Sequence, residues 1–247
     1  MSCVVRINPR RPYRIGPQGL RRIVLGESGT GDAAEQAQDH ATMQKPLRTS
    51  IPAVRWNMAI AHSLKGRLDD HAREAIAAAA ILASADTGVV ALILGAFHED
   101  ATALGADRII VASDFDASRY EPAREEAAIQ ELVRQYAPEH IFMPDNWLGD
   151  GDLGRRLIAK QTTTAAARVT EIDAKHIAVA WSDGATLAVA PLPRFVLLQP
   201  GAVDSNLPFV GAGELQPKQK FADVAEVCRD LGLEPTEAGA IALGEAD

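Results

Sequence analysis

Apolar and polar positions alternate with two different periods between residues 54 and 172. Short apolar runs, such as the continuous run 88–94, predict strands that are buried on both faces of a sheet. Longer segments between them carry apolar residues three and four positions apart, which predicts helices. The predicted strands are 54–60, 88–94, 108–112, 140–143 and 169–172, and the predicted helices are 71–83, 101–104, 122–135 and 150–160. Strands and helices alternating at this spacing predict βαβ units that close into a parallel sheet.

The pattern changes after residue 172, where short apolar segments follow one another with only tight turns between them. Strands are predicted at 176–181, 186–189 and 195–198, and we expect them to form an antiparallel edge on the sheet. Residues 200–220 are predicted to be a linker, and residues 221–231 a last short helix. The predicted fold class is therefore α/β, a three-layer, twisted and mostly parallel sheet with antiparallel edge strands.

The first fifty residues lack the pattern of a compact domain. Six arginines precede the first acidic residue, Glu27, and these are Arg6, Arg10, Arg11, Arg14, Arg21 and Arg22. A polar stretch follows, so residues 1–50 are predicted to be a basic arm and linker. The sequence leaves open whether this arm is disordered or wraps a partner subunit. The α/β domain is then predicted at 51–202, and a linker with a short helix at 203–247.

The composition narrows the class of protein. The 247 residues carry a formal net charge of −8, which argues against general nucleic-acid binding because that function needs a basic face. Cys3 and Cys228 lie near opposite ends without a CxxC partner, so no disulfide framework is expected. No apolar run approaches the roughly 18 residues that cross a bilayer, and the N-terminus lacks the apolar region of a signal peptide. These features predict a cytoplasmic protein without membrane insertion.

The clearest candidate ligand site is the acidic start of the predicted helix 150–160. Asp150, Gly151 and Asp152 could hold Mg²⁺ or place a phosphate group at a helix N-terminus. The simpler interpretation is that Asp150 or Asp152 caps the helix and complements its dipole. Thr162 offers a hydroxyl to a ligand, or it simply follows the end of the helix. Asp150, Gly151, Asp152 and Thr162 are therefore the candidate cofactor-binding residues.

The remaining motifs argue against catalysis by this chain. The glycines at 26–31 lack the Gly-Lys-Ser/Thr of a phosphate loop and the strand and helix that flank it. The six histidines are scattered without metal-ligand spacing. Ser28, Ser63 and Ser113 lack the context of a nucleophile elbow. We therefore predict no metal site and no catalytic residues.

Several segments resemble the electron transfer flavoprotein family, in the order in which that family has them. They are GADRIIV at 105–111, PEHIFMP at 138–144, GDLGRRLIA at 151–159, ARVTEI at 167–172 and FVLLQPGA at 195–202. The segment GRLDDHAR at 66–73 resembles alpha subunits associated with N-methyl amine and dimethylglycine-like demethylases, and LGEAD at 243–247 resembles the start of their flavin domain. The chain thus resembles the N-terminal domain of an alpha subunit, lacking the C-terminal FAD domain.

This resemblance implies a Rossmann-like scaffold domain that pairs with an electron transfer flavoprotein beta subunit. FAD would be bound in the assembled complex, mainly outside this segment, and AMP would be expected on the beta subunit. Electrons would come from a flavoprotein dehydrogenase or demethylase and pass to a quinone oxidoreductase, so the chain would be an electron carrier subunit and not an enzyme. The alternative is a stand-alone adenine-nucleotide-binding α/β protein, with its ligand near Gly95, Ser113 and residues 145–151.

Overall fold

The computed structural model describes residues 14–15, 21–22, 45–49, 51–116, 119–147, 149–182, 184–225 and 231. The chain divides into two compact units, Met1–Lys45 and Pro46–Asp247. In the first unit, β1 (Arg14–Ile15) pairs antiparallel with β2 (Arg21–Arg22). Apart from residues 45–49, the rest of the predicted arm and linker at 1–50 lies outside the described residues, as do both cysteines, the glycines at 26–31 and the segment 243–247.

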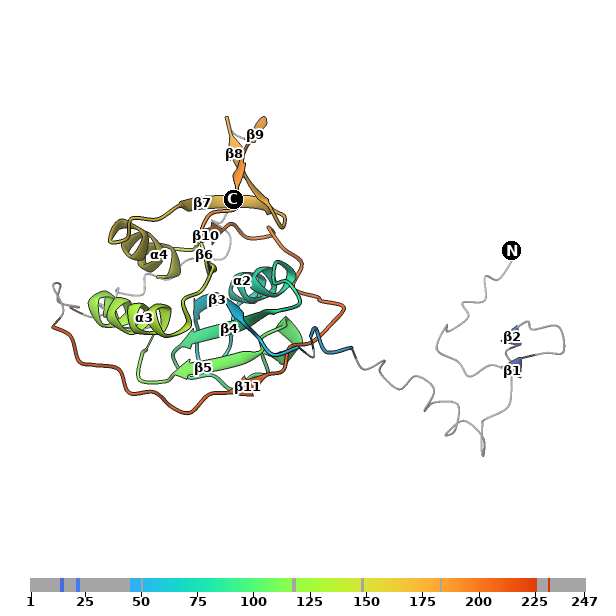
Figure 1. The fold of residues 1–247 in the computed structure, drawn as a ribbon, viewed down its shortest axis with the longest axis horizontal. Helices are drawn as coiled ribbons and strands as arrows, with labels where there is room; N and C mark the ends of the chain where they lie inside the picture. Colours follow the sequence, from blue (N-terminus) through green and yellow to red (C-terminus); the bar gives the residue numbers. More distant parts are fainter. Residues whose placement is uncertain are drawn as a thin grey trace, which may run out of the picture. The chain divides into compact units, whose positions relative to one another are not determined.

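The described part of the second unit is built on a nine-stranded sheet (Figure 1). Its first seven strands in spatial order run parallel, and the last two continue it antiparallel. The spatial order is β11 (Glu214–Leu215), β5 (Arg108–Ala112), β4 (Thr87–Leu94), β3 (Arg55–His62), β6 (His140–Pro144), β10 (Phe195–Leu198), β7 (Ala165–Ile172), β8 (His176–Trp181) and β9 (Thr186–Pro191). The predicted α/β class, with a mostly parallel sheet and antiparallel edge strands, is confirmed.

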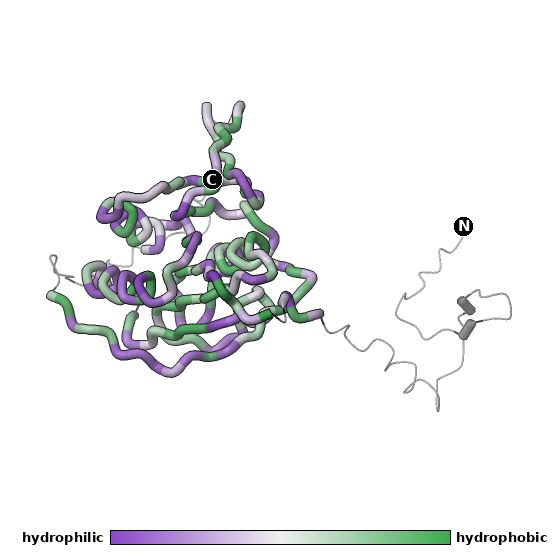
Figure 2. The backbone as a smooth tube through the Cα atoms, in the orientation of Figure 1, coloured by the Kyte–Doolittle hydropathy of each residue, from purple (hydrophilic) through white to green (hydrophobic). Residues whose placement is uncertain are grey.

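Helices cover both faces of this sheet. On one face lies α2 (Asp70–Ile81), which begins where Asp69 accepts a hydrogen bond from the backbone N–H of Ala72 at 2.7 Å. The buried residues of α2 are mostly alanines, so its backbone lies close to β3 and β6. The opposite face carries α3 (Pro122–Tyr136) and α4 (Asp150–Ala159), which bury leucines and isoleucines against the same strands. Figure 2 shows the hydrophobic strands enclosed between these layers.

One strand was assigned to the wrong part of the sheet. Residues 195–198 were predicted in the antiparallel edge, but β10 runs parallel between β6 and β7. All four of its residues are buried, with Val196 and Leu198 facing α2, and Phe195 and Leu197 facing α4. A strand that is apolar on both faces is stable only inside a sheet covered on both sides, and this explains its central position.

The segment that follows β10 also differs from the prediction of a linker. Leu207 is buried, and β11 adds a parallel strand beside β5. Only the short 3-10 helix η2 (Thr102–Leu104) stands between β4 and β5 on the α2 face. Residues 221–225 are not helical, so the predicted helix 221–231 is wrong over its first turn, and most of its remainder lies outside the described residues.

Asp107, the acidic residue of the turn before β5, ties both flanking segments to the sheet. Its carboxylate accepts hydrogen bonds from the backbone N–H groups of Val89 at 2.9 Å and Ala212 at 3.3 Å. The same carboxylate pairs with the guanidinium of Arg48, whose side chain is almost completely buried. The chain on either side of the predicted domain 51–202 is therefore packed onto it from residue 48 to at least residue 215.

Candidate functional site

The order of the strands creates a switch point next to β3. From β3 the chain passes to β4 and β5 on one side, and then returns to place β6 on the other side. The loops that leave the carboxyl ends of β3 and β6 therefore run to opposite faces of the sheet. Ligands of doubly wound folds bind in the crevice that such a divergence opens. This position, together with the start of α4, is the candidate site in the described part of the chain.

A largely buried histidine occupies the switch point. His62 is the last residue of β3, and its Nδ1 lies 2.8 Å from Oδ1 of Asp150 at the start of α4. Its Nε2 lies 3.1 Å from Oε1 of Glu125 on α3. The three side chains are only 10%, 3% and 8% exposed, respectively. Asn146 joins them, because its amide donates to Oδ2 of Asp150 at 2.8 Å. We refer to His62, Glu125, Asn146 and Asp150 as the switch-point cluster.

The switch-point cluster holds a charged imidazole ring. Burial alone would lower the pKa of His62, but the hydrogen bonds and negative charges of Asp150 and Glu125 outweigh this effect and raise the pKa to about 10. The ring is therefore an imidazolium ion at neutral pH, with one carboxylate on each nitrogen. Because both ring nitrogens are already hydrogen-bonded, His62 cannot serve as a general base. The two carboxylates instead keep the ring positively charged and hold it in one position.

Neither Asp150 nor Asp152 caps α4, so that part of the simpler interpretation is wrong, although both lie in the first turn of the helix. The N-cap of α4 is Gly149, in a backbone conformation (φ 126°) that favours glycine, and it is Oδ1 of Asn146 that accepts the backbone N–H of Asp150, at 3.2 Å. Asp150 instead turns its carboxylate toward His62 and also accepts the backbone N–H of His62 at 2.9 Å. Asp152 lies on the surface, where it accepts hydrogen bonds from Arg156 at 2.7 Å and Tyr120 at 2.8 Å.

The other two candidate residues lie in different surroundings. A Cβ atom on Gly151 would come within 2.3 Å of the carbonyl oxygen of Asn146, so the loop before α4 is packed against its first turn. Thr162 is exposed and follows the far end of α4. The ten residues of that helix separate it from Asp150 by about 15 Å. The structure therefore brings Asp150 and Gly151 to the switch point and leaves Thr162 away from it.

Sequence reasoning did not find His62 or Glu125. His62 was one of several scattered histidines, and the pairing of its strand with β6 was needed to bring it to Asp150. Glu125 did leave a signal, since it lies four and seven positions before Ile129 and Leu132, on the buried face of α3. A carboxylate on the apolar face of a helix indicates a buried cationic partner.

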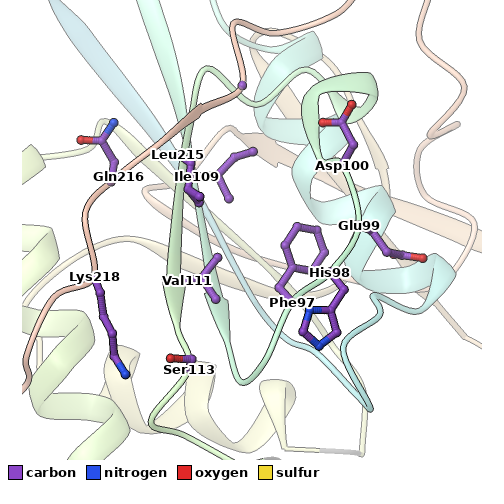
Figure 3. Close-up of a pocket in the computed structure, with 11 residues that line it drawn as sticks. Phe97, His98, Glu99, Asp100, Ile109, Val111, Ser113, Leu215, Gln216 and Lys218 are labelled. Carbon is purple, nitrogen blue, oxygen red and sulfur yellow. The ribbon is translucent and has the colours of Figure 1, made fainter.

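A separate groove lies on the α2 face beside β5 and β11 (Figure 3). Its volume is about 530 Å³, and it is open where η2 replaces a full helix. Ile109, Val111 and Leu215 form apolar walls, and Ser113 from the alternative nucleotide site lies at its end. The charged groups here are engaged with neighbours: Lys218 pairs with Asp114 at 2.7 Å, and Glu99 pairs with Arg73 at 2.7 Å and Arg67 at 3.0 Å. No group of three or more His, Cys, Asp or Glu side chains that could hold a metal ion occurs among the described residues.

Comparison with known proteins agrees with the motifs in the sequence. Residues 57–228 match the model of the electron transfer flavoprotein domain, which covers more than half of the chain. The chain is 29% identical over 258 aligned positions to the electron transfer flavoprotein subunit alpha of Chromohalobacter salexigens. The match covers 99% of this chain and 61% of the relative, so the chain spans less than two thirds of the relative's length. On the basis of this domain match, the chain belongs to the electron transfer flavoprotein family.

Proposed function

We propose that this chain is the scaffold domain of an electron transfer flavoprotein alpha subunit, and that it pairs with a beta subunit in an FAD-containing heterodimer. The complex would accept electrons from a flavoprotein dehydrogenase or demethylase and pass them to the quinone pool, in the cytoplasm. The chain itself would position its partner and the flavin without supplying catalytic residues. The family match and the similarity to an alpha subunit support this assignment. No helix in the described ranges is long and apolar enough to span a membrane.

The observation that carries the proposal is the unprotected edge of the sheet at β9. All six residues of this strand, TLAVAP, are exposed, and none of them is charged. The hairpin of β8 and β9 projects away from the rest of the second unit in Figure 1. Free-standing sheets protect such edges with charged residues, bulges or a covering element. The absence of charge on β9 supports its burial against a partner subunit.

Exposed apolar side chains extend this surface. Val189 and Trp181 are each 67% exposed, and Leu187 is 47% exposed. Trp181 and Arg168 line a hollow of about 550 Å³ beside the turn of the hairpin. Exposed aromatic side chains and arginines are enriched in the central contacts of protein interfaces. We assign the contact with the beta subunit to this hairpin.

The residues at the switch point support the proposal that FAD is bound mainly outside this segment. A dinucleotide held by a doubly wound fold places its pyrophosphate at a helix N-terminus beside the switch point. Here the carboxylate of Asp150 is turned toward that position, and the backbone before it is packed too tightly for a side chain at Gly151. These residues do not fit the pyrophosphate of FAD, so we derive no flavin contact for them.

Co-expression of the full chain with a beta subunit tests the proposal. We expect the two to purify together as a 1:1 complex. Val189→Glu should weaken their association at least about tenfold, because it places a charge in an apolar contact. Val54→Glu is the matched control, since Val54 is equally apolar and 75% exposed but lies away from the hairpin, before β3.

The outcomes separate the parts of the proposal. If the chain and the beta subunit do not associate at all, the scaffold function is wrong. If they associate and Val189→Glu has no more effect than Val54→Glu, the scaffold function stands but the contact lies elsewhere. Circular dichroism of both variants checks that each one keeps the fold.

A further inference from the structure

The start of α4 has the components of a phosphate-binding site. It follows a parallel strand at a switch point, its N-cap is a glycine, and the one side chain that accepts a backbone N–H there is Asn146, whose Oδ1 lies 3.2 Å from the N–H of Asp150. Three donors converge on one position next to it: the backbone N–H of His62, the imidazolium of the same residue, and the amide of Asn146. A backbone N–H, a cation and an amide at a helix N-terminus are the donors that hold phosphate groups in proteins.

All three donors are satisfied by the carboxylate of Asp150. Oδ1 accepts from the backbone N–H of His62 at 2.9 Å and is 2.8 Å from its ring nitrogen, while Oδ2 accepts from Asn146 at 2.8 Å. The side chain of Asp150 is 3% exposed, so no water layer separates it from these donors. An external anion would have to displace a carboxylate that belongs to the chain itself.

The charges around the helix start also oppose an external anion. Four carboxylates face three cations there: Glu125, Asp145, Asp150 and Asp152 against His62, Arg155 and Arg156. Each cation is already paired, Arg155 with Asp145 at 2.7 Å and Arg156 with Asp152 at 2.7 Å. Adding a phosphate would place another negative charge within a few ångströms of Asp150, which is strongly unfavourable in a buried site.

We propose that Asp150 is a built-in anion that closes the switch point of this domain to phosphate-bearing ligands, including nucleotides. The residue acts as a specificity determinant: it occupies the anion position and satisfies donors that a phosphate would otherwise use. Removing its charge leaves the imidazolium of His62 and the amide of Asn146 beside the helix start without the anion that they now share. This inference concerns the chain alone and does not depend on the beta subunit.

Titration of the full chain with inorganic phosphate and with AMP tests the inference, using calorimetry and thermal shift. The wild-type chain should show no saturable binding of either at millimolar concentration. Asp150→Gly and Asp150→Asn should bind phosphate at least about tenfold more tightly than the wild type, because a like charge is removed from the site. Asp152→Asn is the matched control, since it removes a carboxylate from the same helix turn but on the surface. Adding His62→Gln to Asp150→Asn should abolish the gain.

Each outcome decides the question. Saturable binding of phosphate or AMP by the wild type overturns the inference, as does equal affinity in all variants. A gain in Asp152→Asn as large as that in Asp150→Asn also overturns it. If an Asp150 variant is unfolded in buffer but folds when acetate or phosphate is added, the inference is supported, because the added anion replaces the missing carboxylate. If neither anion restores folding, the carboxylate is not an anion substitute and the inference is wrong.

Discussion

The largely buried imidazolium of His62 predicts that the stability of this domain depends on pH. The pKa of His62 is raised from its ordinary value of 6.5 to about 10 in the folded chain. Between these two pH values the folded state binds a proton that the unfolded state has lost. The contribution is therefore complete below pH 6.5, and it is lost as the pH rises toward 10.

The magnitude follows from the two pKa values. One pH unit corresponds to about 1.36 kcal/mol per proton. The interval between 6.5 and about 10 therefore gives a contribution of at most about 5 kcal/mol to the free energy of unfolding. This is a large share of the stability of a typical domain, about 5–15 kcal/mol. The side chain of His62 is 10% exposed and both its partners are buried, so solvent screens the interaction only weakly.

Urea unfolding of the wild type and of His62→Gln at several pH values between 6 and 10 measures this contribution. We expect the variant to be less stable at pH 6.5 by several kcal/mol, because two buried carboxylates lose their cation. The difference between the two proteins should shrink by up to about 1.4 kcal/mol per pH unit as the pH rises. Titrating groups outside the switch-point cluster are common to both proteins and cancel in the difference. Parallel stability curves for the two proteins across this range would refute a raised pKa for His62.

Three further predictions concern residues that hold the domain together, and each is checked by urea or thermal unfolding. Asp107→Asn should cost about 3 kcal/mol, because it leaves a buried guanidinium without its carboxylate, whereas Asp86→Asn at an exposed ion pair should change little. Leu207→Ala should lower the free energy of unfolding by about 2–5 kcal/mol if the segment after β10 is part of the core. An unchanged free energy of unfolding would instead indicate that this segment is a linker. Gly151→Ala should cost roughly 1–3 kcal/mol because its Cβ would overlap a carbonyl oxygen, and wild-type stability would contradict this close packing.

The α/β class followed from the sequence because the periods of its apolar residues are local properties. The continuous apolar run before Gly95 became β4, with every residue buried, and residues 108–112 and 176–181 became strands with the predicted bounds. The cap of α2 is likewise a local feature, since Asp69 accepts a backbone N–H only three positions along the chain. The family resemblance depended on the same local segments.

The placement of β10 and the switch-point cluster depended on contacts between distant parts of the chain. A four-residue apolar strand looks the same at an edge or in the centre of a sheet, and only pairing with both β6 and β7 decides between them. Asp150 lies where a helix cap is expected from the sequence, but its carboxylate binds the imidazolium of His62, 88 positions away along the chain. His62 reaches Asp150 and Glu125 only because β3 lies beside β6 beneath two helices. The sequence alone therefore determined which segments form strands and helices, whereas the tertiary structure decided which charges meet, because electrostatic energy in a buried site depends on distances in space and not along the chain.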